Sequence, residues 1–129
     1  RSKTMSMGIK GGSKMNGELI ALVDGEMGAG KKGGMMLGTG ITDIQDLDKM
    51  FGMVETLQTH PMLSQHITKV TFVSKLNKKP KHPYVHPHIG GEEDGSMNLG
   101  GSIIWFELIL AVDISKDMVI DVENKEEEE

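Results

Sequence analysis

The sequence predicts a single α+β domain, and three observations support this fold class. The chain has 129 residues, a usual length for one compact domain. Apolar residues make up 37% of the chain and stand in short clusters, as in globular proteins. Segments rich in β-branched residues stand beside segments whose apolar spacing suits a helix. We therefore expect one domain over residues 1–122, followed by a disordered acidic tail at residues 123–129.

The first half of the chain predicts two strands, a helix between them and one undecided segment. Residues 5–9 alternate polar and apolar side chains, which favours a first or edge strand. A helix is expected over residues 15–27, where glycines then end it. Residues 33–41 are apolar and rich in glycine, which indicates a buried strand. Residues 43–53 have an apolar spacing that suits a short helix or a distorted strand, and the pattern leaves both open.

The second half predicts a hairpin and two further strands. Residues 67–74 are rich in β-branched side chains, and a lysine-rich turn leads from them to a second extended segment at residues 83–89. Pro87 has no N–H to donate, so this second strand should be an edge strand or carry a bulge. Three segments complete the domain: a loop at 90–101, a long apolar strand at 103–114 and a short strand at 118–122.

The distribution of charge argues against a surface built for nucleic acid. The formal net charge is −5, and the last seven residues carry five glutamates and one lysine, which leaves the remaining chain near −1. A near-neutral domain lacks the positive field that supplies most of the affinity for nucleic acid. Lysines gather at residues 75–82, and we interpret that cluster as a solvated hairpin turn.

Cysteine content and hydropathy indicate a cytoplasmic protein. The absence of cysteine excludes disulfides, thiolate metal sites and cysteine nucleophiles. No apolar run approaches the roughly 18 to 20 residues that cross a bilayer. Residues 1–4 are not followed by the uninterrupted apolar core of a signal peptide. We therefore expect no membrane partner.

Residues 25–32 follow the pattern of a phosphate-binding loop up to its last position. The pattern requires Ser or Thr there to hold magnesium, whereas this chain has Lys32. Gly33 and Gly34 would also break the helix that should follow the loop. We interpret the match as a coincidence in a glycine-rich chain and keep a nucleotide-binding enzyme as a minor hypothesis. No serine stands in the context of a nucleophile, so no catalytic residue is assigned.

Three histidines lie close together in the sequence: His82, His86 and His88, followed by acidic residues at 92–94. On a strand, residues 86 and 88 project from one face, so their imidazoles would bind one divalent ion such as zinc with a ligand from elsewhere. The alternative is a polar strand face exposed to solvent or to a neighbouring subunit. A His-x-His pair alone leaves both interpretations open.

The residues around the histidine pair stand in a recognisable order. Pro83, Tyr84 and Val85 precede His86-Pro87-His88, and Asp94-Gly95 and Gly100-Gly101 follow. This order resembles the signature of PPC domains, the "plants and prokaryotes conserved" family. Residues 30–40 look like the helix-to-strand passage of that family, which ends in Gly-x-Gly. Two positions depart from the family: Ser102 replaces its third histidine, and Thr68 replaces its strand glutamate.

The resemblance implies a mostly antiparallel sheet of about seven strands with one or two helices, assembled into a homotrimer. In family members that bind a metal, the His-x-His pair and the third histidine are the expected ligands. The resemblance thus points to His86 and His88 as zinc ligands, with Ser102 in place of the third. Our leading hypothesis is a trimeric, nominally DNA-associated assembly module without evident catalysis. The alternative is a metal- or small-ligand-binding protein that uses the histidine pair at a subunit boundary.

Overall fold

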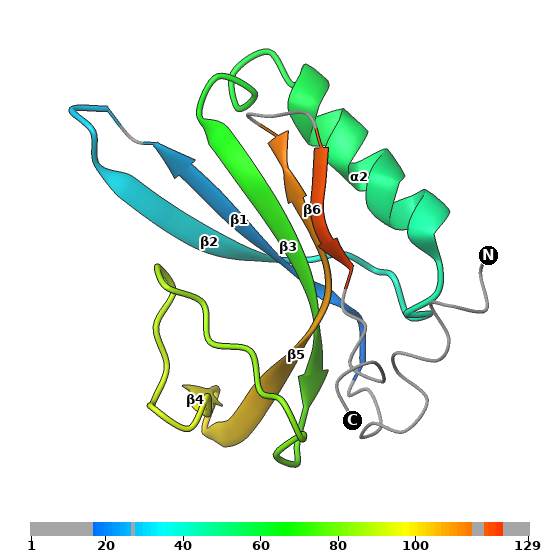
Figure 1. Ribbon diagram of the computed structural model, residues 1–129, viewed down its shortest axis with the longest axis vertical. Helices are drawn as coiled ribbons and strands as arrows, with labels where there is room; N and C mark the ends of the chain where they lie inside the picture. The colour runs from blue at the N-terminus through cyan, green and yellow to red at the C-terminus, as the bar shows by residue number, and fades with distance from the viewer. Residues whose placement is uncertain (1–16, 27, 115–117, 123–129) are drawn as a thin grey trace.

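Six antiparallel strands form one twisted sheet in the computed structural model, which describes residues 17–26, 28–114 and the backbone of 118–122 (Figure 1). The strand order is β2-β1-β3-β5-β4, and β6 pairs with the last part of β5, residues 110–113. The strands are β1 Ile20–Glu26, β2 Lys32–Gly38, β3 Ile67–Leu76, β4 Met97–Leu99, β5 Ser102–Asp113 and β6 Met118–Val122. The helix α2, Leu47–Thr59, lies between β2 and β3 in the chain. The α+β class is thus confirmed, whereas the described residues do not confirm a count of seven strands.

One face of the sheet packs against α2 and buries the larger of two apolar clusters. The helix begins after Asp46, whose side chain accepts a hydrogen bond from the Lys49 N–H at 3.3 Å as an N-cap. Its buried residues recur at helical spacing, so a single stripe of the helix faces the sheet. The cluster contains Met50, Val54 and Leu57 from α2 and Ala21, Val23, Val70, Phe72, Leu110 and Val112 from the central strands.

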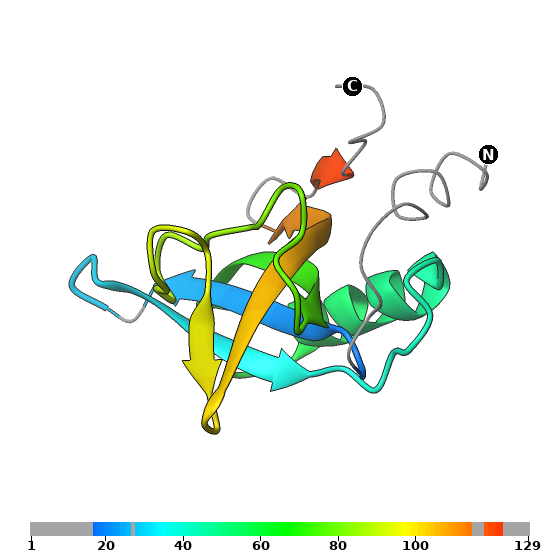
Figure 2. The same ribbon diagram turned by 90° about the horizontal axis from the view of Figure 1, so that it is seen from below.

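The opposite face of the sheet is covered by residues 77–101, which include β4 (Figure 2). A second apolar cluster is buried there, formed by Leu22, Val73, Ile104 and Phe106 with Tyr84, Ile89 and Met97 packed against it. The covering segment follows β3 without regular structure until β4 begins. The central strands are therefore buried on both faces, as in sheets that lie between two layers.

The helix expected over residues 15–27 is wrong, because Ile20–Glu26 forms β1. β1 lies between β2 and β3 in the sheet and is buried on both faces: Ala21 and Val23 belong to the α2 cluster, and Leu22 to the opposite one. A strand buried on both faces has a continuous apolar sequence, which periodicity does not distinguish from a buried helix. The strand expected at residues 5–9 lies outside the described residues.

The strand expected at residues 33–41 exists as β2, but it is exposed rather than buried. Within the described sheet β2 pairs with β1 alone, and Met35 and Met36 on it are 49% and 37% exposed. The turn between the two strands contains three consecutive residues with positive φ, at positions 28–30. The phosphate-loop pattern of residues 25–32 therefore spans a β-hairpin with no helix after it. This geometry removes the structural basis of the nucleotide hypothesis.

The hairpin expected between residues 67–74 and 83–89 is wrong in its second strand. The first strand is confirmed as β3, but its neighbours in the sheet are β1 and β5. Residues 83–89 form a loop with an isolated bridge between His86 and Gly90. Pro83 and Pro87 have no N–H, so this segment lacks the donors that a paired strand requires. The basic run at residues 75–82 therefore leads from β3 into a loop and does not turn a hairpin.

The other segments agree with the sequence more closely. The undecided segment at 43–53 is helical, although α2 begins later and extends further, over Leu47–Thr59. The strands expected at 103–114 and 118–122 are confirmed as β5 and β6. The loop expected at 90–101 contains the short strand β4, which pairs with the beginning of β5. The acidic tail at 123–129 lies outside the described residues.

Substitution of two glycines by alanine should change the stability of this fold in opposite directions. A Cβ added at Gly25 would lie 2.8 Å from the backbone oxygen of His66, whereas a Cβ added at Gly52 in α2 would meet nothing within 4 Å. We expect Gly25→Ala to lower the free energy of unfolding by about 1–3 kcal/mol, because the paired backbones must shift. Gly52→Ala should raise it by roughly 0.5–1 kcal/mol, because alanine favours a helix over glycine. Urea unfolding measures both changes, and an unaltered midpoint for Gly25→Ala would contradict the close approach.

Candidate metal centre

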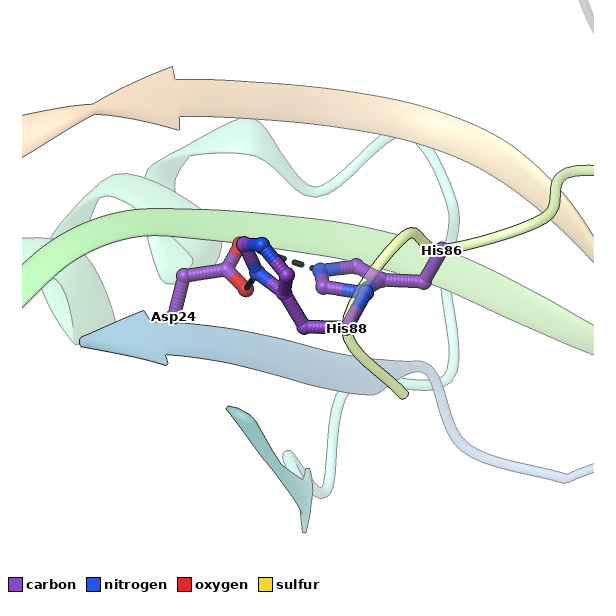
Figure 3. Close-up of side chains that lie close together, drawn as sticks. All are labelled: Asp24, His86 and His88. Carbon is purple, nitrogen blue, oxygen red and sulfur yellow. Dashed lines mark hydrogen bonds and ion pairs between the residues drawn. The ribbon is translucent and has the colours of Figure 1, made fainter. Parts of the chain in front are cut away.

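The structure brings Asp24, His86 and His88 together on the sheet face opposite α2 (Figure 3). His86 Nε2 lies 3.0 Å from Asp24 Oδ2, and His88 Nδ1 lies 3.0 Å from Asp24 Oδ1. One possible ligand atom from each residue lies within 4.8 Å of the others, so the three residues could hold a metal ion. The predicted histidine pair is therefore found together, with a carboxylate 62 residues away in sequence from His86.

The position of Asp24 follows from the alternation of β1. Side chains two residues apart on a strand point to the same face, so Asp24 lies on the face of Leu22, away from α2. Across the sheet Asp24 is level with Gly34 on β2 and Lys69 on β3. The pairing with β3 shifts register directly after Asp24, and such bulges often occur beside functional sites. Only 6% of Asp24 is exposed, so its carboxylate needs hydrogen-bond donors close by.

The donors are the rings of His86 and His88, which lie on one loop. This loop makes a tight turn that is closed by hydrogen bonds to the ring of His86. The N–H groups of His88 and Ile89 both donate to His86 Nδ1, at 2.9 and 3.2 Å. The Gly90 N–H donates to the backbone oxygen of His86 at 3.3 Å. Ile89 packs over Gly34, where an added Cβ would lie 3.2 Å from Ile89 Cγ1. The tight turn at 86–90 thus depends on an imidazole acceptor inside it and on a glycine beneath it.

These contacts fix the tautomer of His86. Because Nδ1 accepts from two N–H groups, it carries no proton, and the proton of the neutral ring is on Nε2. Nε2–H then donates to Asp24 Oδ2, so both ring nitrogens are satisfied. The side chain is 1% exposed. His86 is therefore a buried hydrogen-bonding residue in this conformation, with no lone pair left for a metal ion.

His88 stands in a different environment, because 37% of its side chain is exposed. Its Nδ1–H donates to Asp24 Oδ1, which leaves Nε2 as the unprotonated nitrogen of the neutral ring. The two imidazoles pack edge to face with centroids 5.6 Å apart. Of the two histidines, His88 is thus the one that solvent and dissolved ions reach.

Tyr84 packs on the inner side of the site. Its ring meets the ring of His86 edge to face, with centroids 6.2 Å apart. Burial raises the pKa of Tyr84 above its usual value of 10, the Thr71 hydroxyl nearby partly offsets this, and the negative charge of Asp24 adds to the rise. The phenol therefore keeps its proton at neutral pH. Its backbone N–H donates to Phe106 O at 2.8 Å, which anchors the loop to β5.

The candidate site opens into a surface pocket of about 450 Å³. The pocket is lined by Asp24, Gly25, Glu26, Lys32, Thr68, Lys69, Pro87 and His88. Four of these residues are charged, and they come from three adjacent strands, β1, β2 and β3. The buried residue His86 does not line the pocket, in agreement with its satisfied ring. The exposed edge of the site is thus formed by His88 and the carboxylate behind it.

Other residues that the sequence singled out lie outside this site. Ser102 stands at the position of the family's third histidine and begins β5. The residue of β5 that is level with Lys69 and Asp24 is Asp113, eleven positions further along the strand, so Ser102 lies far from the site. His82 is exposed and does not belong to the cluster. Asp94 supports its own turn, because its Oδ1 accepts the Ser96 N–H at 2.9 Å, and hydrogen bonds from Ser96 lower the pKa of its carboxyl group.

Asp24, which the sequence pattern does not single out, provides the third group in place of residue 102. Because the pattern of residues 15–27 predicts a helix, it does not place this carboxylate on a sheet face. A signal does exist in the sequence: Asp24 is a single acidic residue directly after the apolar run 19–23 and directly before Gly25. An acidic residue at the end of a buried strand indicates a functional site more strongly than one in a loop.

Comparisons of this chain with family models, with curated proteins and with solved structures gave no match. The resemblance to PPC domains therefore stays a prediction that depends on the residues of the chain itself. No helix in the described part of the chain is long and apolar enough to cross a membrane.

Nuclear magnetic resonance tests the assignment of the two tautomers. Long-range ¹H–¹⁵N correlations should show the proton on Nε2 of His86 and on Nδ1 of His88 in the ion-free protein, because these two nitrogens face Asp24. His82 is exposed and should show exchange between its two neutral tautomers, so it serves as the control. A proton on Nδ1 of His86 would contradict the turn described above.

Proposed function

We propose that this chain binds a divalent transition-metal ion, with zinc as the physiological candidate. The observation that supports the proposal is the convergence of Asp24, His86 and His88, whose possible ligand atoms lie within 4.8 Å of one another. Imidazole nitrogen with carboxylate oxygen is a donor set that suits zinc and its neighbours in the first transition row. The set contains no thiolate and too few oxygen ligands for calcium.

The three residues would not contribute equally. His86 would bind an ion through Nε2 only if its proton moved to Nδ1, where it would face the N–H groups of His88 and Ile89. Asp24 and His88 are therefore the direct ligands, and the ion replaces the proton between them. His86 keeps its hydrogen bond to the other oxygen of Asp24, as the outer-shell partners of metal ligands commonly do. The remaining positions around the ion are left to water or to an external ligand.

Zinc titration by calorimetry, in a buffer that does not coordinate the metal, tests this arrangement. We expect saturable binding with one ion per chain, and no such binding by His88→Ala or Asp24→Asn, because each loses a direct ligand. His86→Gln should bind about 10- to 100-fold more weakly, the usual effect of removing an outer-shell partner. His82→Ala, on the same loop but outside the cluster, is the matched control and should bind like the unchanged protein.

Two results would contradict the proposal. Equal binding by the unchanged protein and by His88→Ala would place the ion elsewhere. A complete loss of binding in His86→Gln with an intact circular dichroism spectrum would make His86 a direct ligand and reverse the assigned roles.

The assembly function implied by the PPC resemblance is a second candidate. It is supported by β2, which pairs with β1 alone in the described sheet and exposes Met35 and Met36. An unprotected edge strand with apolar side chains favours pairing with another chain. A trimer formed in this way would be an assembly module, and the resemblance links such modules to DNA-associated proteins.

Light scattering coupled to size exclusion tests the second candidate. We expect the mass of three chains, and we expect Met35→Lys with Met36→Lys to shift the mass toward one chain by placing charge on the edge. Lys49→Glu, on the exposed side of α2, is a control that should leave the mass unchanged. A monomer at all concentrations would refute the trimer without affecting the metal proposal.

A further inference from the structure

We propose that the metal-loaded pocket binds a small oxyanion, a carboxylate or phosphate-type group, between the ion and the ammonium groups of Lys69 and Lys32. This inference rests on the proposed metal site and names the ligand that completes it. Three observations support it: the positions of the two lysines, the balance of charge in the lining, and the space next to His88.

Strand register places both lysines on the face of the site. Lys69 is the partner of Asp24 across β1 and β3, and Lys32 is the partner of Glu26 across β1 and β2. Directly opposed residues in an antiparallel pair project from the same face. Residues 24 and 26 also share a face, because they are two apart on β1. Lys69 is therefore level with Asp24, Lys32 is two residues further along the same face, and both line the pocket.

The charges of the lining depend on the ion. Without metal, the carboxylates of Asp24 and Glu26 balance the ammonium groups of Lys32 and Lys69, and the lining has no net charge. A divalent ion bound by Asp24 and neutral His88 adds two positive charges. Asp113 lies level with Lys69 on β5 but does not line the pocket. Attraction for an anion should therefore arise when the metal binds, since a focused positive potential requires that excess charge.

The pocket also has the room and the coordination positions that such a ligand needs. Two direct protein ligands leave several positions on the ion open, because His86 is occupied by Asp24 and by two N–H groups. His88 is 37% exposed and lines the pocket together with Asp24, so a ligand in the pocket can reach an ion held between them. A volume of about 450 Å³ falls within the usual range for small-ligand pockets. An oxyanion can then bind the ion through one oxygen and accept hydrogen bonds from lysine through another.

Cobalt(II) in place of zinc makes this inference measurable, because its visible absorption reports on ligands that enter its coordination sphere. The cobalt-loaded protein is titrated with acetate in one series and with methylphosphonate in another. We expect a saturable spectral change with at least one of the two anions. An effect of acetate alone identifies a carboxylate ligand, and an effect of methylphosphonate alone a phosphate-type ligand.

Variants at the two lysines separate their contribution from that of the ion. Lys69→Ala and Lys32→Ala should each weaken anion binding by about tenfold or more, since each removes a charged hydrogen bond. Both should leave cobalt affinity within a factor of a few, because neither lysine is a ligand. Lys69→Arg should retain much of the anion affinity. Lys78→Ala, an exposed lysine outside the pocket lining, is the matched control and should behave like the unchanged protein.

The possible outcomes distinguish this inference from the metal proposal. If cobalt does not bind, both are refuted. If cobalt binds but neither anion changes its spectrum, the metal site stands and the oxyanion pocket is refuted. Equal anion affinity in the unchanged protein and both lysine variants would also refute it. Anion binding to the metal-free protein with undiminished affinity, measured by calorimetry, would refute the dependence on the ion.

Discussion

The buried carboxylate of Asp24 is the constraint on which the arrangement of the second sheet face depends. A charge that is 6% exposed is stable in a protein only when donors surround it, because the loss of hydration otherwise costs several kcal/mol. The donors here are two imidazoles from a loop whose prolines prevent regular pairing with the sheet. The carboxylate and the loop thus satisfy each other: the loop supplies N–H groups, and the carboxylate fixes where the loop lies.

This pairing explains why a ring nitrogen of His86 is used inside the turn. A tight turn leaves backbone N–H groups without partners, and buried donors of this kind require an acceptor. Nδ1 of His86 takes two of them, which forces the proton to Nε2 and directs it at Asp24. The same ring therefore folds the loop and orients the carboxylate. The ring of His88 accepts no hydrogen bond from the turn, and it is the ring of the pair that lines the pocket.

The sequence predicted the strands whose local chemistry decides their structure. Residues 67–74 and 103–114 became β3 and β5, because β-branched and apolar side chains favour a strand in any packing arrangement. The apolar run of β1 predicts a helix instead, since burial on both faces removes the alternation that identifies a strand. The sequence predicts the histidine pair on one face of a strand, whereas in the structure a turn brings the two rings together. Asp24 could not be joined to it, since that contact depends on the register of β1 with its neighbours and on the path of a loop 62 residues later.

The loop at 83–90 is attached to the sheet by three hydrogen bonds: from the Tyr84 N–H to Phe106 O, and from the rings of His86 and His88 to Asp24. The strands that it contacts pair with one another without its help. A segment attached in this way can detach while the α2 cluster stays intact, at a free energy below that of global unfolding. A ligand that joins Asp24 to His88 would raise the free energy of this local opening by its own binding free energy. Binding of such a ligand would therefore slow hydrogen exchange at the amides of His88 and Ile89, whose protons are donated to His86 Nδ1. It would change the melting temperature of the whole domain only weakly.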